Sequence, residues 1–415
     1  MKTPVANADI LNVMKVHCSS AVVDSVLQDL RNVHGVEGHV LGLRVEGGKS
    51  GGSLLEVLSD RAKLDHLITM CQSRLPEEEV SGMLIGLGDV FKLHGDLGKA
   101  EEFYSLVLAR ARSLGQKRYI AEGLLRRGEL FSRLGRWKDS SADLSESRLL
   151  FAELKESASV GRVENILGTS LAEQGKLKQA QRYFGRALSV FEQAAEQDMT
   201  GTVLMNIGIV YSITGQWDKG LVQYKRAQSY FEELGDVNRL AELHHNMGMS
   251  FLRKGMHKEA IGEFDSAFAL SANCHLVNLM GLACLGKADA HARIGDYPVA
   301  LKLVSQSIGY FSFTSERLNI ADAYKIKGII HREMKNFTFA DTYLKTSLRM
   351  NIELNNQLNI AETCVEIGKL AQAQGNKGEA LRSFEQAFVF YKKIGAEHAV
   401  AGVQASIVAL KERTE

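Results

Sequence analysis

The stretch NIGIVYSITGQWDKGLVQYKRA (206–227) decides the fold class, because it holds three glycines within a sequence that otherwise has helical spacing. Glycine in a helix interior costs about 1 kcal/mol relative to alanine. Gly208, Gly215 and Gly220 therefore need either a structural or a functional explanation. The rest of the chain supplies one, since small residues recur at the same three positions.

The three positions recur with a period of 40 residues through eight repeats. The middle column contains Gly95, Gly135, Gly175, Gly215, Gly255, Gly295 and Gly375, with Lys335 in the one vacant place. Seven residues earlier stand Gly88, Gly128, Gly168, Gly208, Gly248, Ala288, Gly328 and Gly368. Five residues after the middle column stand Ala100, Ser140, Ala180, Gly220, Ala260, Ala300, Ala340 and Ala380. Three columns in one register predict a repeat protein.

Each repeat is predicted to be a helix, a turn and a second helix, because apolar residues such as Leu204 and Tyr211 keep helical spacing. Small residues in the outer columns allow the two helices to pack closely. The middle glycine is expected to end the first helix in the left-handed conformation. Where Lys335 replaces it, the next residue, Asn336, can take that conformation, which predicts a turn shifted by one residue.

With residue 201 as position 1, the fourth repeat resembles the tetratricopeptide repeat signature of large, Gly, aromatic, Gly, aromatic, small, aromatic and Ala. Its residues are Leu204, Gly208, Tyr211, Gly215, Trp217, Gly220, Tyr224 and Ala227. The period of 40, without the family's usual proline, is similar to the extended-helix subtype of Leu-Gly-Asn type adaptors, kinesin light chains and bacterial peptide-sensing regulators. The resemblance implies an all-α, right-handed α-solenoid of about eight repeats.

The domain organisation follows from this register. Eight repeats are expected at 81–120, 121–160, 161–200, 201–240, 241–280, 281–320, 321–360 and 361–400. Residues 401–415 are expected to form a capping helix, because a terminal repeat needs cover for its apolar face. Residues 54–80 are interpreted as a helix of a degenerate leading repeat. Residues 1–53 are interpreted as an irregular segment with a short helix and a glycine-rich loop that lacks Walker spacing.

Composition argues against several function classes. The 50 basic and 49 acidic residues nearly cancel, so we expect no nucleic-acid partner. No window reaches 18 uninterrupted apolar residues, so we expect no membrane insertion. Five scattered cysteines fit a reducing compartment. We therefore expect a cytoplasmic protein, with association with a cytoskeletal or other large assembly left open.

The sequence predicts no enzyme, cofactor or metal. No nucleophile or metalloprotease motif occurs. The adjacent His244 and His245 point to different sides of a helix, and Cys274 with His275 has no second ligand pair nearby. Function is therefore expected to reside on the surface of the array.

The predicted binding surface is one stripe of the first helices. Positions 4, 8 and 11 pack inward, so positions 2, 6, 9 and 13, flanked by 5 and 12, face the other way. The resemblance implies that this stripe lines a concave groove. The candidates combine amides for a peptide backbone, apolar residues for a partner side chain and arginines for an acidic residue. They are Asn206, Asn246, Ile209, Ile213, Met249, Arg253, Arg293, Arg126 and Arg133.

The leading interpretation is a protein-interaction scaffold or adaptor that binds a partner peptide or helix in this groove. One alternative is a regulator that responds to a ligand or peptide, and another is an architectural subunit of a larger assembly. A purely structural role for the patch also remains, in which Ile209, Ile213 and Met249 cover the inside of the superhelix and the asparagines bond the neighbouring repeat. The partner and the oligomeric state are left open.

Overall fold

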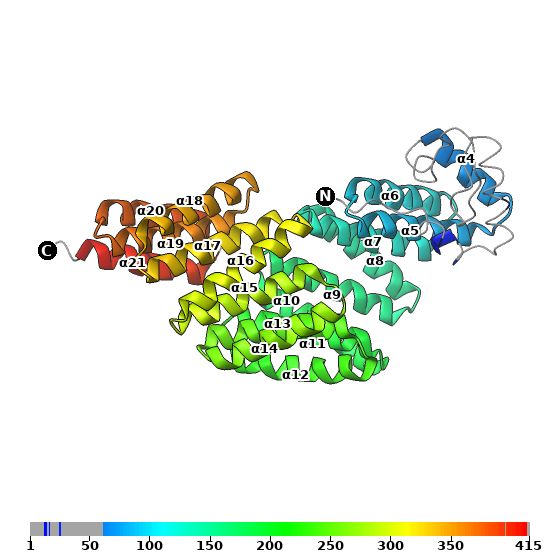
Figure 1. Ribbon diagram of the computed structural model, residues 1–415. Helices are drawn as coiled ribbons and strands as arrows, with labels where there is room; N and C mark the ends of the chain where they lie inside the picture. The colour runs from blue at the N-terminus through cyan, green and yellow to red at the C-terminus, as the bar shows by residue number, and fades with distance from the viewer. Residues whose placement is uncertain (1–11, 15, 17–24, 26–60, 395, 413–415) are drawn as a thin grey trace, which may run out of the picture. The chain divides into compact units, whose positions relative to one another are not determined.

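The computed structural model describes residues 12–14, 16, 25, 61–394 and 396–412 of the chain, and all regular structure in them is helical (Figure 1). The fold is all-α, as predicted. The short helix and glycine-rich loop expected within 1–53, and the start of the helix expected from residue 54, lie outside the described residues apart from the isolated positions named above.

Eight helix pairs follow one another. The first helices are α5 (Glu77–Leu93), α7 (Lys117–Arg133), α9 (Ser157–Glu173), α11 (Gln197–Ile213), α13 (Val237–Lys254), α15 (Val277–Arg293), α17 (Arg317–Glu333) and α19 (Gln357–Ala373). The second helices are α6 (Leu97–Ser113), α8 (Trp137–Glu153), α10 (Leu177–Gln193), α12 (Trp217–Leu234), α14 (His257–Asn273), α16 (Tyr297–Thr314), α18 (Phe337–Glu353) and α20 (Lys377–Lys393). Helix α4 (Arg61–Gln72) precedes them and α21 (Glu397–Glu412) follows.

The turn within seven of the eight described pairs uses the predicted glycine. All seven glycines have positive φ, from 70° at Gly135 to 83° at Gly255 and Gly295. At Gly95 the amide N–H donates to the Lys92 carbonyl and that of Asp96 donates to the Phe91 carbonyl, at 3.2 and 2.9 Å. This pair of bonds is the Schellman motif, which satisfies carbonyls at a helix C-terminus.

The predicted shift of the turn to Asn336 is wrong. Lys335 itself takes the left-handed conformation, with φ of 61°, while Asn336 has φ of −85° and is the N-cap residue of α18. The Lys335 amide donates to Arg332 and the Asn336 amide to His331, at 2.9 and 2.8 Å. The same bonds form as at glycine, so the register set by helix packing outweighs the cost of a side chain at positive φ.

A second series of left-handed residues, which was not predicted, forms the turns between successive pairs. It contains Gly115, Lys155, Ala195, Gly235, His275, Ser315 and Asn355, with φ between 52° and 67°. Left-handed residues therefore recur about every 20 residues, and helices of 17 or 18 residues alternate with short turns. Only two of these seven residues are glycines, which concealed the series in the sequence.

The first glycine column makes room for a large side chain on the partner helix, an aromatic ring in five repeats and a leucine at Gly128 and Gly328. A Cβ atom added to Gly208 would lie 2.4 Å from Cε1 of Tyr224. In the sixth repeat the column holds Ala288, and the partner position holds the smaller Val304 in the same core. Larger and smaller residues thus compensate across the pair, as close packing requires.

The helices form two compact units, residues 1–167 and 168–415, with the boundary inside α9. The core of the first unit lies between α4, α5 and α6, where Leu67, Phe91 and Phe103 are buried. Met14 from the N-terminal segment is buried in the same core. Helices α5 to α8 then pack in chain order.

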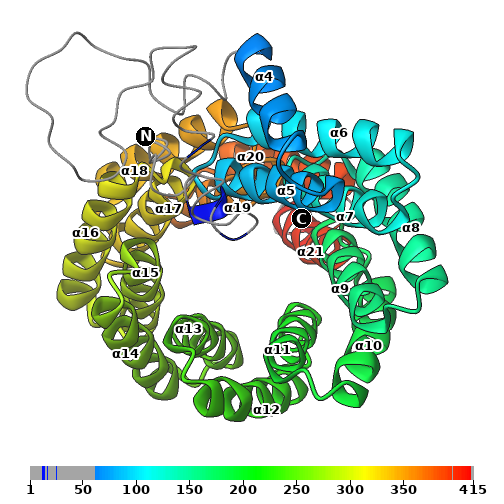
Figure 2. The same cartoon turned by 90° about the vertical axis from the view of Figure 1, so that its right-hand side faces the viewer.

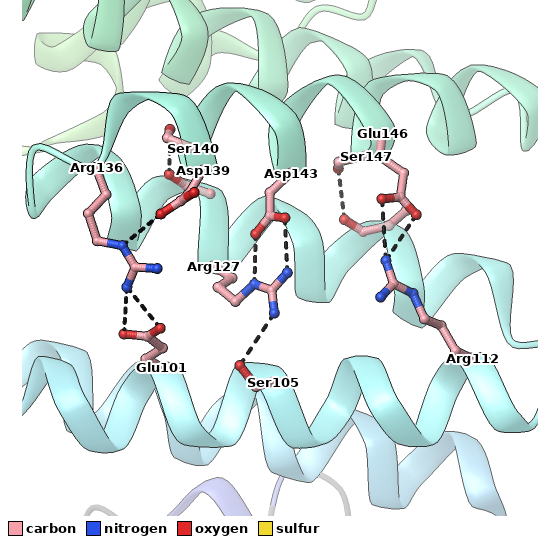
Figure 3. A network of polar contacts seen from close by, with 12 residues as sticks. Glu101, Ser105, Arg112, Arg127, Arg136, Asp139, Ser140, Asp143, Glu146 and Ser147 are labelled. Carbon is pink, nitrogen blue, oxygen red and sulfur yellow. Dashed lines mark hydrogen bonds and ion pairs between the residues drawn. The ribbon is translucent and has the colours of Figure 1, made fainter.

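Polar contacts supplement packing between α6, α7 and α8 of the first unit (Figure 3). Arg127 makes two bonds to Asp143, at 2.7 and 2.9 Å, and Arg112 pairs with Glu146 at 3.1 Å. In the third column, Ser140 replaces the usual alanine and donates to the Gly128 carbonyl at 2.8 Å. The serine is therefore compatible with close packing because its hydroxyl bonds to the facing helix.

The second unit contains α10 to α21, packed in chain order. Figure 2 shows α11 and α13 on one side of this unit and α12 and α14 on the other. Neighbouring first helices also contact each other, from α11 to α13 and onward to α19, so they form a continuous inner layer. The predicted capping helix is present as α21, where Val403 and Leu410 are buried and Ile407 packs against the core of α19 and α20.

Candidate functional site

Two pockets lie on the first-helix layer of the second unit, with volumes of about 540 and 880 Å³. Most of their lining residues occupy positions 2, 5, 6, 9, 12 and 13 of the repeats, with residue 201 as position 1. The pockets therefore lie on the stripe that helical geometry turns away from the pair interface. We call the smaller one the apolar pocket and the larger one the charged pocket.

The apolar pocket lies between α11, α13 and the start of α15. Its lining residues are Met205, Ile209, Glu242, His245, Asn246, Leu276, Val277, Asn278, Leu279 and Leu282. Asn278 accepts a hydrogen bond from the Asn319 amide at 3.1 Å. Six aliphatic or thioether side chains make this pocket suited to an apolar group of a ligand.

Two ionisable residues, His245 and Glu242, are among the lining residues of the apolar pocket. Burial lowers the pKa of His245 to about 4, so its ring is neutral at pH 7, and its Nδ1 is shielded from water without a hydrogen-bond partner. Its ring lies 5.6 Å from that of Phe264, which favours the neutral form in apolar surroundings. Glu242 is the one acidic group in the lining, and burial raises its pKa.

The charged pocket extends along α13, α15, α17 and α19. Its charged lining residues are Arg253, Asp289, Arg293, Asp322, Lys325, Arg332, Glu333, Glu362, Glu366 and Lys369. Five cationic and five anionic side chains balance. Their pairing decides which of them a ligand can use.

Lys325 is neutralised from two helices. Its Nζ lies 3.1 Å from Asp322 on α17 and 2.5 Å from Glu362 on α19. Burial alone would lower the pKa of Lys325, but the two carboxylates outweigh it and raise the pKa. Asp322 also accepts a bond from the Asn359 amide at 3.1 Å. This group therefore bridges successive first helices.

A second bridge lies two turns further along α17. Arg332 is 2.5 Å from Glu366 on α19 and 2.8 Å from its neighbour Glu333. Lys369 also pairs with Glu366, at 2.7 Å. Burial opposes ionisation of Glu366, but Lys369 and Arg332 overcome it and lower the pKa. The charges at this end of the pocket serve mainly to hold α17 and α19 together.

At the other end of the charged pocket, Arg293 has a carboxylate partner within the protein, whereas Arg253 does not. Arg293 makes two bonds to Asp289 on its own helix, at 3.0 and 3.2 Å. Arg253 is exposed, and no carboxylate of the described residues lies within ion-pair distance of it. Arg253 is therefore the cation of this pocket that remains available to a ligand.

The structure brings five of the predicted residues together. Ile209 and Asn246 line the apolar pocket, whereas Met249, Arg253 and Arg293 line the charged one. Ile209 and Met249 are half-buried and also pack against the cores of their repeats. They therefore serve the fold and line the pockets at the same time.

The other four predicted residues lie elsewhere. Asn206 is half-buried on α11 and Ile213 is 51% exposed at its end, and neither belongs to the lining of these pockets. Arg126 and Arg133 lie in the first unit. Arg126 pairs with Glu122 at 3.0 Å, and Arg133 lies 3.7 Å from Glu129. These arginines are engaged in ion pairs along α7.

Sequence reasoning missed His245, Lys325, Arg332 and the residues 276–279 at the start of α15. Positions 5 and 12 were treated only as flanks of the stripe. Lys325 gave no signal, because the matching place in the next repeat holds Val365 and the partner Glu362 lies three positions earlier in that repeat. Residues 276–279 directly follow His275 of the unpredicted turn series, so their approach to α13 had no sequence signal.

Among the described residues, no group of three or more His, Cys, Asp or Glu side chains could hold a metal ion. His244 is instead 2.7 Å from Glu263 on the next helix. None of the described helices is both long enough and apolar enough to cross a membrane.

Comparisons with known proteins agree with this geometry. Residues 199–273, which include α11 to α14, match the family model of the tetratricopeptide repeat. The fold is similar to that of a Rap protein complexed with competence and sporulation factor, with 12% identity, a TM-score of 0.56 and coverage of 81% of this chain and 99% of that one. It is also similar to the apo form of the quorum sensor NprR from B. thuringiensis, with 15% identity, a TM-score of 0.59 and coverage of 91% and 99%. No curated protein sequence matches the chain. At these identities the similarity concerns the fold alone.

Proposed function

We propose that this tetratricopeptide repeat protein is a non-enzymatic interaction protein that binds a partner peptide or helix along the first-helix layer of its second unit. The observation that carries the proposal is the continuity of the two pockets. Asn246 in the apolar pocket and Met249 in the charged pocket are one turn apart on the same face of α13. A single extended segment can therefore occupy both pockets.

The chemistry of α13 suits such a segment. The Asn246 amide can both donate to and accept from a peptide backbone. Ile209 and Met249 offer apolar contact on either side of it. Solenoids use extended inner surfaces of this kind for binding. Asn206 occupies the same repeat position one repeat earlier, and we propose that it extends the contact along α11.

A second candidate function is a regulator that responds to a peptide or small ligand. The fold similarity to a quorum sensor, and to a Rap protein in complex with a sporulation factor, favours it. Both candidates use the same groove. They differ in whether occupation changes the contacts of another partner.

The proposal is tested with peptides selected from a displayed random library against the full chain. We expect the double variant Asn206→Ala, Asn246→Ala to bind selected peptides at least ten-fold more weakly, with thermal unfolding unchanged. Asn273→Ala, an exposed asparagine at the end of α14, is the matched control and should bind as the parent does. Equal losses of binding and stability in the double variant would contradict the proposal, because the asparagines would then act in the fold.

A further inference from the structure

The inner stripe of α13 carries opposite charges at its two ends. Glu242, Asn246, Met249 and Arg253 follow one another at i, i+4, i+7 and i+11, so they lie on one face of the helix. Each of them lines one of the two pockets. Read along the helix, the stripe is anionic, polar, apolar and cationic.

We propose that this stripe selects ligands by charge order: a basic side chain of the bound segment faces Glu242, an acidic one faces Arg253, and apolar residues lie between them. The inference rests on the proposed peptide-binding function and names the chemistry of its ligand. Glu242 and Arg253 become the residues that determine specificity.

Pairing within the protein leaves these two charges for the ligand. Of the five cations in the charged pocket, Arg293, Lys325, Arg332 and Lys369 all have carboxylate partners in the described structure. Arg253 has none there. In the apolar pocket, no cation of the described residues lies within ion-pair distance of Glu242. Arg239, three residues earlier on α13, attracts its charge only at longer range, and the other ionisable group of the lining, His245, is neutral at pH 7. A basic group on a ligand would form an ion pair with Glu242, and an acidic group would form one with Arg253.

The dimensions set the spacing of the ligand's charges. Eleven residues of helix separate Glu242 from Arg253, or about 16 Å at the rise of an α-helix. An extended segment advances about 3.3 Å per residue, so the basic and acidic residues should stand about five residues apart. Between them, Ile209, Met249 and Leu282 offer apolar contact to at least one side chain.

The test uses one selected library peptide, synthesised with acetylated and amidated ends so that only side chains carry charge. We expect selected peptides to contain a basic and an acidic residue about five apart with an apolar residue between. Arg253→Glu should weaken binding of such a peptide about ten-fold, and replacing the peptide's acidic residue by lysine should restore it. Glu242→Lys should show the same reciprocity with the basic residue.

The matched control is Lys258→Glu, which changes the net charge equally at an exposed position on α14. It should alter affinity less than two-fold. Peptides that require Asn246 yet respond equally to Arg253→Glu whether they carry glutamate, glutamine or lysine would overturn the charge-order inference and leave the proposed function standing. Failure to select any peptide that depends on Asn246 would overturn both.

Discussion

The two ends of the first-helix layer in the second unit differ in how neighbouring first helices are joined. At α11 and α13, neighbouring first helices are joined by a neutral contact, in which the buried hydroxyls of Ser212 and Ser250 lie 2.6 Å apart. At α17 and α19 they are joined by ion pairs from Lys325 and Arg332. The first end leaves an apolar pocket, and the second fills the surface with charges that satisfy one another.

A charged groove in a repeat protein is therefore not by itself a binding site. The α17 and α19 charges bind each other across the repeat boundary and therefore contribute to the stacking of helices. The stripe of α13 retains unpaired groups at both ends and an apolar centre. We infer that stability depends more on the charged end and ligand binding more on the apolar end.

The largest effect is expected from Lys325→Met at the charged end. The substitution leaves Asp322 and Glu362 facing each other without a cation, and breaking a buried ion pair costs about 3 kcal/mol of unfolding free energy. The Lys325 side chain is only 12% exposed. Lys369→Met, at a half-exposed pair, should cost less than about 1 kcal/mol. Denaturant unfolding of the two variants checks this contrast, and equal losses would contradict it.

A pH effect of intermediate size is expected at the apolar end. The folded-state pKa of His245 is about 4, below its ordinary value of 6.5, so the unfolded chain binds the proton more readily. The associated stability is present above pH 6.5 and is lost as the pH falls toward 4, by about 2 kcal/mol between pH 7 and pH 5. Glu366, with its lowered pKa, contributes in the same direction only at more acidic pH.

Thermal unfolding of the parent and of His245→Gln across pH 7 to 5 measures this effect. The variant should lose less stability over that range than the parent does. An identical pH dependence of the two proteins would show that another group carries the titration.

The smallest effect on the unfolding free energy is expected from substitutions in the turns after α11 and α17. Gly215 follows α11 and Lys335 follows α17, both in the left-handed conformation. Lys335→Gly should raise the unfolding free energy by about 1 kcal/mol, because glycine adopts positive φ without steric strain. Gly215→Lys should lower it by a similar amount. Melting temperatures check both changes, and a destabilised Lys335→Gly protein would mean that the lysine side chain makes a compensating contact.

Much of the fold was predictable from the sequence, because each of the three small-residue columns has one physical cause repeated eight times. Gly208 faces a ring on the partner helix and Gly215 ends a helix, and the stripe of Asn246, Met249 and Arg253 follows from helical geometry alone. The turn at Lys335 was mispredicted because local preference favoured Asn336, whereas the repeat register decided the outcome.

The rest could not be predicted because it depends on which residues meet across repeats. The pairs from Lys325 to Glu362 and from Arg332 to Glu366 span 37 and 34 residues. They become visible only when the spacing between neighbouring first helices is known. The same information shows that Arg293 is engaged by Asp289 and that Arg253 is not, although the two arginines hold the same repeat position.

Binding of partner segments on the inner stripe of α13 can be tested by crosslinking. A photo-crosslinking amino acid is placed at position 249, in the lining of the charged pocket and one turn from Asn246, and in a second protein at position 222, an exposed site on α12. With a peptide selected against the full chain, the account predicts crosslinking at 249, none above background at 222, and loss of the 249 crosslink in the Asn206→Ala, Asn246→Ala background. Equal or stronger crosslinking at 222 would contradict it.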